Sequence, residues 1–262
     1  ARSVDDAERM LAVLADDPAL LKRSRSIDVA SIKIGIVDAW RTGHAATDGL
    51  FDDAVRVVQR LHTKVSSSSM IATPENVHND EYTVLIHELR SDLDDYLATR
   101  VAGGAPRSVA DVVEFNRANA DVELVHFGQE IFEMAANSQG RSSQDYVDAR
   151  TRNLAWVQTH LDAALVEHDV LIAPAYMPAW KTDLALGHPS AGGAVTSPAA
   201  IAGFPTVTIP MGLVAGLPVA LSLVGTRNSE PLLIAIARAV ENALGLFGDP
   251  DWRPRFVQPS RG

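Results

Sequence analysis

The feature of this sequence that most limits its fold is a set of short apolar runs, rich in β-branched residues, among longer helical patterns. Runs of this length and composition predict buried strands. The four runs are Ile32–Val37, Val170–Pro174, Val207–Pro210 and Pro218–Val224. Because the strands alternate with helices and are interrupted by a long helical stretch, we predict an α/β fold with a mixed β-sheet flanked by helices.

The helical patterns carry recognisable start signals. Ser3 precedes a first turn that contains Asp5 and Asp6, which favours an N-cap followed by a helix to about Leu14. A second helix is predicted from about Leu50 to Leu61, and a last one from the cap Ser229 to about Leu244. Between them lies a helical insert at about 81–166, in which Ser108 is a further predicted cap.

Charge and composition exclude several classes of function. The chain has 23 Lys and Arg against 33 Asp and Glu, a net charge of −10, so we expect no nucleic-acid partner. It has no cysteine, which excludes disulfides, thiolate nucleophiles and zinc–thiolate sites. No apolar run approaches the length of a membrane span and no leader pattern precedes the first helix, so we expect no membrane association and a cytoplasmic location.

Two groups of residues resemble catalytic motifs, but each lacks a residue that its motif requires. His87-Glu88 begins like a zinc-protease helix, but Ser91 stands where the second histidine ligand must be, and we predict no metal and no cofactor. Lys64 lies close to the serines 66–69, yet a nucleophile on a strained turn needs flanking glycines, and none is present. We therefore assign no catalytic role to this second stretch.

The segment between the second and third strand runs is loop-like and contains Gly192, Gly193 and Ser197. Glycines allow close approach of the backbone to a ligand or to another strand, and small residues in loops are common in binding sites. Residue types alone leave both interpretations open. Ser197 before Pro198 is a predicted helix cap, and Gly203 is the predicted end of that short helix.

Several motifs in a fixed order carry a resemblance to a known family. The run 197–205, followed by Thr208–Gly212, Gly216–Val219 and Ser229–Leu233, closely resembles the C-terminal end of the amidase-signature family. Upstream, Asp169–Pro174 resembles a strand of that family, and Ala1–Ala7 resembles the helix after its catalytic region. The stretches 115–119, 127–130 and 178–181 resemble the peptide-amidase-like members. Each piece is weak alone, but their order is specific.

The resemblance implies an amidase-signature fold and hydrolysis of a carboxylic amide C–N bond. The family uses a Lys–Ser–Ser set, in which lysine acts through a bridging serine on a nucleophilic serine beside backbone N–H donors. No segment of this sequence matches that set. We therefore expect residues 1–262 to be the C-terminal portion of a single amidase domain without its N-terminal catalytic part, inactive alone, and paired with that half or with a second copy.

The substrate implied is a small-molecule or peptide amide. Gln129 could bind its amide group or bond local backbone at a helix start, and Phe127 and Trp180 could form an apolar wall or belong to the core. The predicted substrate-binding residues are Phe127, Gln129, Trp180, Gly192, Gly193 and Ser197. Two other hypotheses remain: an amidotransferase A-type subunit that acts on charged tRNA, and a non-catalytic remnant that serves as a binding module.

Overall fold

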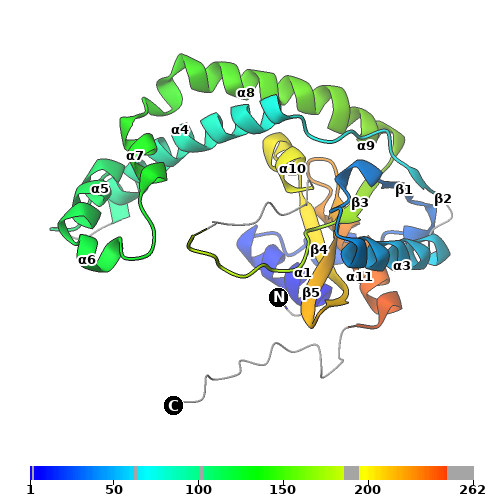
Figure 1. Cartoon of the computed structure of the whole chain (residues 1–262). Helices are drawn as coiled ribbons and strands as arrows, with labels where there is room; N and C mark the ends of the chain where they lie inside the picture. The colour runs from blue at the N-terminus through cyan, green and yellow to red at the C-terminus, as the bar shows by residue number, and fades with distance from the viewer. Residues whose placement is uncertain (2, 62–63, 101–102, 186–194, 247–262) are drawn as a thin grey trace, which may run out of the picture. The chain divides into compact units, whose positions relative to one another are not determined.

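The computed structural model describes residues 1, 3–61, 64–100, 103–185 and 195–246 (Figure 1). These residues form two compact units. The sheet unit comprises Ala1–Ala72, Gln158–Asp183 and the described residues after 194, whereas the helical unit comprises Thr73–Val157 with the short segment from Leu184. Each unit is described by itself.

A five-stranded mixed sheet forms the centre of the sheet unit, with strand order β2-β1-β3-β5-β4. Strands β2, β1 and β3 are parallel to one another, and β5 runs antiparallel to both β3 and β4. The predicted mixed α/β sheet is therefore confirmed. The strands are β1 (Lys33–Ile36), β2 (Lys64–Ser67), β3 (Val170–Pro174), β4 (Thr206–Val214) and β5 (Leu217–Val224).

Strands β4 and β5 form a hairpin whose turn determines the register. Ala215 and Gly216 both have positive φ, at 49° and 79°, which is the backbone of a two-residue turn matched to the twist of a hairpin. Val214 and Leu217 pair directly across that turn. The hairpin completes the antiparallel half of the sheet.

The helices of the sheet unit cover the sheet. Helices α3 and α11 contact each other and pack on one face, where Ile34, Ile172 and Leu221 are fully or almost fully buried. Alternation along each strand turns Gly35 and Leu171 to the opposite face, beside α9. The helices are α1 (Val4–Leu14), α2 (Leu20–Arg25), α3 (Ala45–Leu61), α9 (Ala163–Glu167), α10 (Thr196–Ala202) and α11 (Glu230–Leu244), with helical turns at Val29–Ser31, Asp38–Trp40 and Gln158–Asp162.

The predicted caps can be checked directly. The Ser3 hydroxyl accepts a hydrogen bond from Asp6 N at 3.1 Å, and Ser108 accepts one from Asp111 N at 3.1 Å. Both caps are confirmed. Ser229 occupies the N-cap position of α11 but makes no capping hydrogen bond through its side chain.

The helical unit consists of helices and connecting turns, with a small apolar cluster of Ile86, Val109 and Ala135. Arg90 donates to the carbonyl of Ala136 at 2.6 Å, which ties the longest helix to the end of α7. The helices are α4 (Glu75–Arg100), α5 (Val109–Ala118), α6 (Ala120–Glu123), α7 (Glu130–Asn137) and α8 (Gln144–Val157), with a helical turn at Gly140–Ser142.

Candidate functional site

The carboxyl ends of the parallel strands are the first place to look for a site, because ligands in open α/β sheets bind outside those ends. Strands β1 and β3 pair in parallel, so the segments after Ile36 and Pro174 leave the sheet at the same edge. A helical turn that ends in the fully buried Trp40 follows β1. An irregular segment that contains Tyr176 and Trp180 follows β3.

Tyr176 and Trp180 form an aromatic pair at this edge. Their ring centroids lie 6.3 Å apart with the rings tilted by 39°, a favourable geometry for two aromatic rings. Each side chain is 39% exposed, so the pair offers ring surface to a ligand and is not plain core. Trp180 was a predicted site residue, whereas Tyr176 was missed. The signal for Tyr176 was its position just after a buried strand, four residues before Trp180.

Ser197 lies in the first turn of α10, in the connection between β3 and β4. The prediction that it caps this helix is wrong, because the helix begins one residue earlier and Val195 is the N-cap, with helical backbone and no side-chain hydrogen bond. Pro198 still stands in the first turn, where its missing N–H costs nothing. Gly203 ends the helix at φ 67°, as predicted. In the part of the chain that the structure describes, the half-buried Ser197 hydroxyl has no hydrogen-bond partner.

Phe127 and Gln129 belong to the helical unit and differ sharply in exposure. Phe127 is 62% exposed, whereas Gln129 is 7% exposed at the N-cap of α7. The Gln129 amide accepts from Asn116 Nδ2 at 3.1 Å and donates to the carbonyl of Val113 at 3.3 Å. These bonds join α7 to α5, and Gln129 makes no capping hydrogen bond at the start of its own helix, so its amide is engaged by another helix and not by local backbone.

The remaining predicted residues, Gly192 and Gly193, lie outside the described residues. Ser197 and Trp180 belong to the sheet unit, whereas Phe127 and Gln129 belong to the helical unit. The convergence of these residues on one concavity therefore stays a prediction. What the structure brings together is the pair Tyr176 and Trp180.

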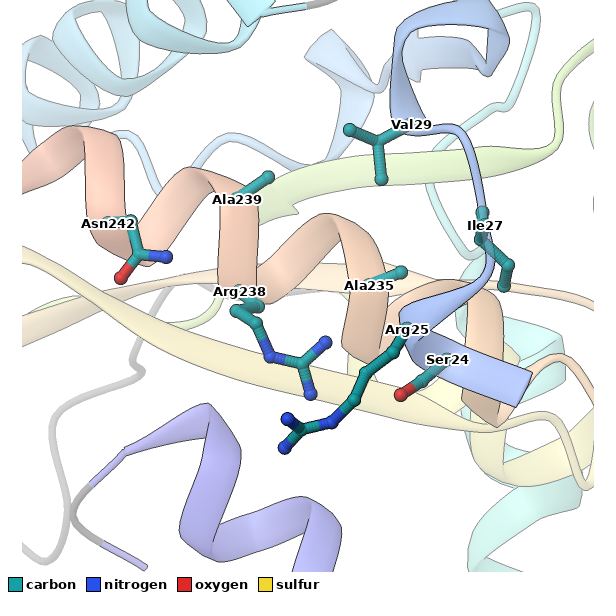
Figure 2. A pocket seen from close by; sticks show the side chains of 8 residues that line it. All are labelled: Ser24, Arg25, Ile27, Val29, Ala235, Arg238, Ala239 and Asn242. Carbon is teal, nitrogen blue, oxygen red and sulfur yellow. The ribbon is translucent and has the colours of Figure 1, made fainter. Parts of the chain in front are cut away.

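A pocket of about 320 Å³ lies elsewhere in the sheet unit, between α2 and α11 (Figure 2). Figure 2 shows the guanidinium groups of Arg25 and Arg238 side by side at this pocket. Both lie within 3.3 Å of the same oxygen of the buried Glu8, and Arg238 also bonds Asp5 at 2.6 Å. The pocket is lined by Ser24, Arg25, Ile27, Val29, Ala235, Arg238, Ala239 and Asn242.

The charges around this pocket are balanced within the protein. Burial alone would raise the pKa of Glu8, but hydrogen bonds from Ser24 and Arg238 outweigh it and hold the pKa below its usual value. The hydrogen bond from Arg238 likewise lowers the pKa of Asp5. Carboxyl groups with shifted pKa values can mark functional sites, but structural ion-pair networks also shift carboxyl pKa values. Because both arginines already contact carboxylates, we interpret the cluster as a structural connection among α1, α2 and α11.

The described residues also contain neither a group of metal ligands nor a membrane-spanning helix. Among the residues that the structure describes, no group of three or more potential ligands could hold a metal ion. His87, from the zinc-protease-like motif, instead has its Nδ1 2.9 Å from the carbonyl oxygen of Gly140. A search of the described helices finds none long and apolar enough to cross a membrane.

Comparison with known proteins decides the family. The profile of the Amidase family matches residues 1–234. The chain belongs to the Amidase family. The motifs from Ala1–Ala7 to Ser229–Leu233 lie within the matched range, so the resemblance predicted from them is confirmed.

Individual relatives in the Amidase family include hydrolases and one component of an amidotransferase. The structure of peptide amidase PAM, solved with the competitive inhibitor chymostatin, is 31% identical with a TM-score of 0.80, covering 92% of this chain and 52% of PAM. The A-type subunit of the glutamyl-tRNA(Gln) amidotransferase of Exiguobacterium sibiricum is 24% identical, covering 95% and 55%. Mandelamide hydrolase of Pseudomonas putida is 25% identical, covering 82% and 44%. The chain thus spans about half the length of the relatives it matches.

Proposed function

We propose that residues 1–262 are the C-terminal portion of a single amidase domain that hydrolyses carboxylic amides. The observation that carries this proposal is the similarity to PAM, at 31% identity over 92% of the chain. The second support is the extent of the family match, residues 1–234. The substrate class we propose is a small-molecule or peptide amide.

In this proposal the reacting groups and the binding groups come from different parts of the polypeptide. A Lys–Ser–Ser set outside these 262 residues supplies the nucleophile and its base, and forms an acyl-enzyme as the amine or ammonia leaves. The residues of this chain bind and orient the amide. Tyr176 and Trp180 contact its apolar part, and the Ser197 hydroxyl, which is without a partner among the described residues, is available to a polar group.

The test compares residues 1–262 alone with the complete product of the gene. We expect the complete product to release ammonia from peptide C-terminal amides, and the 262 residues alone to stay at background. In the complete product, Trp180→Ala should raise KM for amides with apolar side chains more than for glycinamide derivatives. Leu184→Ala, a change at an exposed apolar residue outside the aromatic pair, is the matched control.

Two outcomes would contradict the proposal in different ways. Amide turnover by residues 1–262 alone that vanishes in Ser67→Ala or Ser68→Ala would place the nucleophile in this chain. A complete product that binds amides but never hydrolyses them would favour the binding-module hypothesis.

A second candidate function is a role within a tRNA-dependent amidotransferase. It is favoured by the similarity to the A-type component of the Exiguobacterium sibiricum enzyme over 95% of the chain. It predicts a stable complex with different proteins and glutamine-dependent amidation of charged tRNA. The stretch Phe127–Glu130, which resembles peptide-amidase-like members, favours the first candidate. Purification of the complete product, followed by mass spectrometry of any stoichiometric partner, separates the two.

A further inference from the structure

A serine and a histidine from distant parts of the chain meet at the outer end of the sheet. Ser66 in β2 lies with its Oγ 3.0 Å from Nε2 of His168, which follows α9. The serine is exposed, whereas the histidine is 6% exposed. A nucleophile within hydrogen-bond reach of a base is the arrangement that activates serine in acyl transfer.

The imidazole of His168 is oriented by a second contact, through its other nitrogen. Nδ1 of His168 lies 3.2 Å from the carbonyl oxygen of Ala164, in the last helical segment before the strand. A carbonyl only accepts, so Nδ1 carries a proton, and in the uncharged tautomer that this fixes Nε2 presents its lone pair to the Ser66 hydroxyl. The base is therefore oriented by a third group, as in nucleophile–base pairs of enzymes.

A glycine makes room for this contact. Gly35 pairs with Ser66 across the parallel strands, so both lie on the same face of the sheet. A Cβ at position 35 would lie 2.8 Å from Cγ of His168, closer than atoms can approach. The glycine thus allows the ring to lie over β1 and reach β2.

The open edge of β2 supplies a donor for the developing oxyanion. Strand β2 is the terminal strand of the sheet, and Ser68 N donates inward to the carbonyl of Ile36 at 2.8 Å. Since backbone N–H groups alternate along a strand, the N–H of Ser67 points outward, where no described strand pairs with it. The residue after the nucleophile supplies such a donor in other serine hydrolases.

We propose that Ser66 and His168 form a reactive site in which Ser66 is acylated by activated carboxylic esters. His168 Nε2 takes the hydroxyl proton as Oγ bonds to the acyl carbon. The carbon–oxygen bond to the phenolate leaving group then breaks, and the proton passes from His168 to solvent. The products are acyl-Ser66 and a free phenolate.

The serine run allows a test within a single peptide. The complete product of the gene would be treated with p-nitrophenyl acetate and digested with trypsin, which cleaves after Lys64, and fragment ions would locate the acetyl group among Ser66, Ser67, Ser68 and Ser69. We expect acetylation at Ser66 in the folded chain, and no preference among the four serines after denaturation. Equal labelling of the four serines in the folded chain would overturn the proposal without any variant.

Variants then test the role of each residue. Ser66→Ala should abolish acetylation of the tryptic peptide that starts at Val65, whereas the matched control Ser69→Ala, at an exposed serine with no role in the proposed site, should leave acetylation of Ser66 unchanged. His168→Gln should slow acetylation of Ser66 by about 100-fold, the usual contribution of a general base. A wild-type rate in a folded His168→Gln chain would overturn the role of the histidine, and the distribution of label in the unsubstituted chain decides the proposal if that variant does not fold.

Discussion

The two units of this chain are stabilised by different kinds of contact. Among the described residues, every large side chain with less than 2% exposure belongs to the sheet unit, including Phe51, Leu221 and Ile236. The cluster of Ile86, Val109 and Ala135 in the helical unit has smaller side chains, and Ile86 is still 9% exposed. The sheet unit thus buries large apolar side chains completely, whereas the completely buried apolar residues of the described helical unit, such as Val109 and Ala135, are small.

Both units have ion pairs at the surface, and in the helical unit these pairs accompany a smaller apolar core. Arg141 bonds both carboxylate oxygens of Asp92, at 2.5 and 2.9 Å, and Arg152 does the same with Asp80, at 2.6 and 2.8 Å. Exposed ion pairs contribute little, because water screens them and ordering long side chains costs entropy. We therefore expect the helical unit to open at lower free energy than the sheet unit.

The largest expected difference comes from emptying one core site in each unit. Leu221→Ala should cost about 4 kcal/mol in the free energy of unfolding, and Ile86→Ala about 2 kcal/mol, because the second site is partly exposed and packs against side chains that are themselves only partly buried. Hydrogen exchange with mass spectrometry would report protection in each unit separately. Equal losses of protection in the two units would show that the contrast in packing does not control stability.

A smaller effect is expected from the buried carboxylate of the sheet unit. Glu8→Gln should cost about 2 kcal/mol, below the roughly 3–5 kcal/mol of a fully buried pair, because Arg25 is half exposed and Arg238 keeps Asp5. Asp92→Asn, which breaks an exposed pair of the helical unit, is the matched control. Urea denaturation measures both. We expect no measurable change in the free energy of unfolding for Asp92→Asn. A loss comparable to that of Glu8→Gln would show that buried and exposed ion pairs contribute alike.

The smallest effect is a difference in pH dependence. The pKa values of Glu8 and Asp5 are lowered in the folded state, by hydrogen bonds that outweigh burial for Glu8 and chiefly by Arg238 for Asp5. The unfolded chain then binds more protons, so their contribution to stability is present above about pH 4.5 and is lost on acidification. Burial raises the pKa of Glu241, whose contribution has the opposite sign.

Thermal unfolding between about pH 7 and pH 3 would measure this dependence. Glu8→Gln should flatten the loss of Tm on acidification, whereas Glu241→Gln should steepen it. Identical pH profiles for the two variants would mean that the network around the α2–α11 pocket does not control the response to acid.

The strands that could be predicted were those with continuous apolar composition. Val170–Pro174 is buried at every residue, and its predicted and observed bounds agree. The edge strand Lys64–Ser67 is exposed at three of its four residues, so no apolar pattern marks it. The start of α3 at Ala45 was also missed, because Thr47, Asp48 and Gly49 have loop-like composition.

The side-chain contacts that join positions far apart in sequence were less predictable than the strands. Asn116, whose side chain donates to Oε1 of Gln129, lies on another helix, α5. The meeting of Ser66 and His168 depends on strand register over a separation of 102 residues. A short motif records residue types and spacing, whereas these contacts depend on the folded arrangement.

The contact between the first and last helices has a consequence for biosynthesis. The N–H of Val4 donates to Glu241 at 3.2 Å, and Arg238 bonds Asp5, so α1 is held by residues made more than 230 positions later. A ribosome adds roughly 5–20 residues per second, so α1 waits on the order of ten seconds or more for its partner. In that interval the residues from Thr73 to Val157 are completed and can fold first. The apolar face of α1 therefore needs protection during synthesis, as do β1 and α3, whose partners β3 and α11 are also made later.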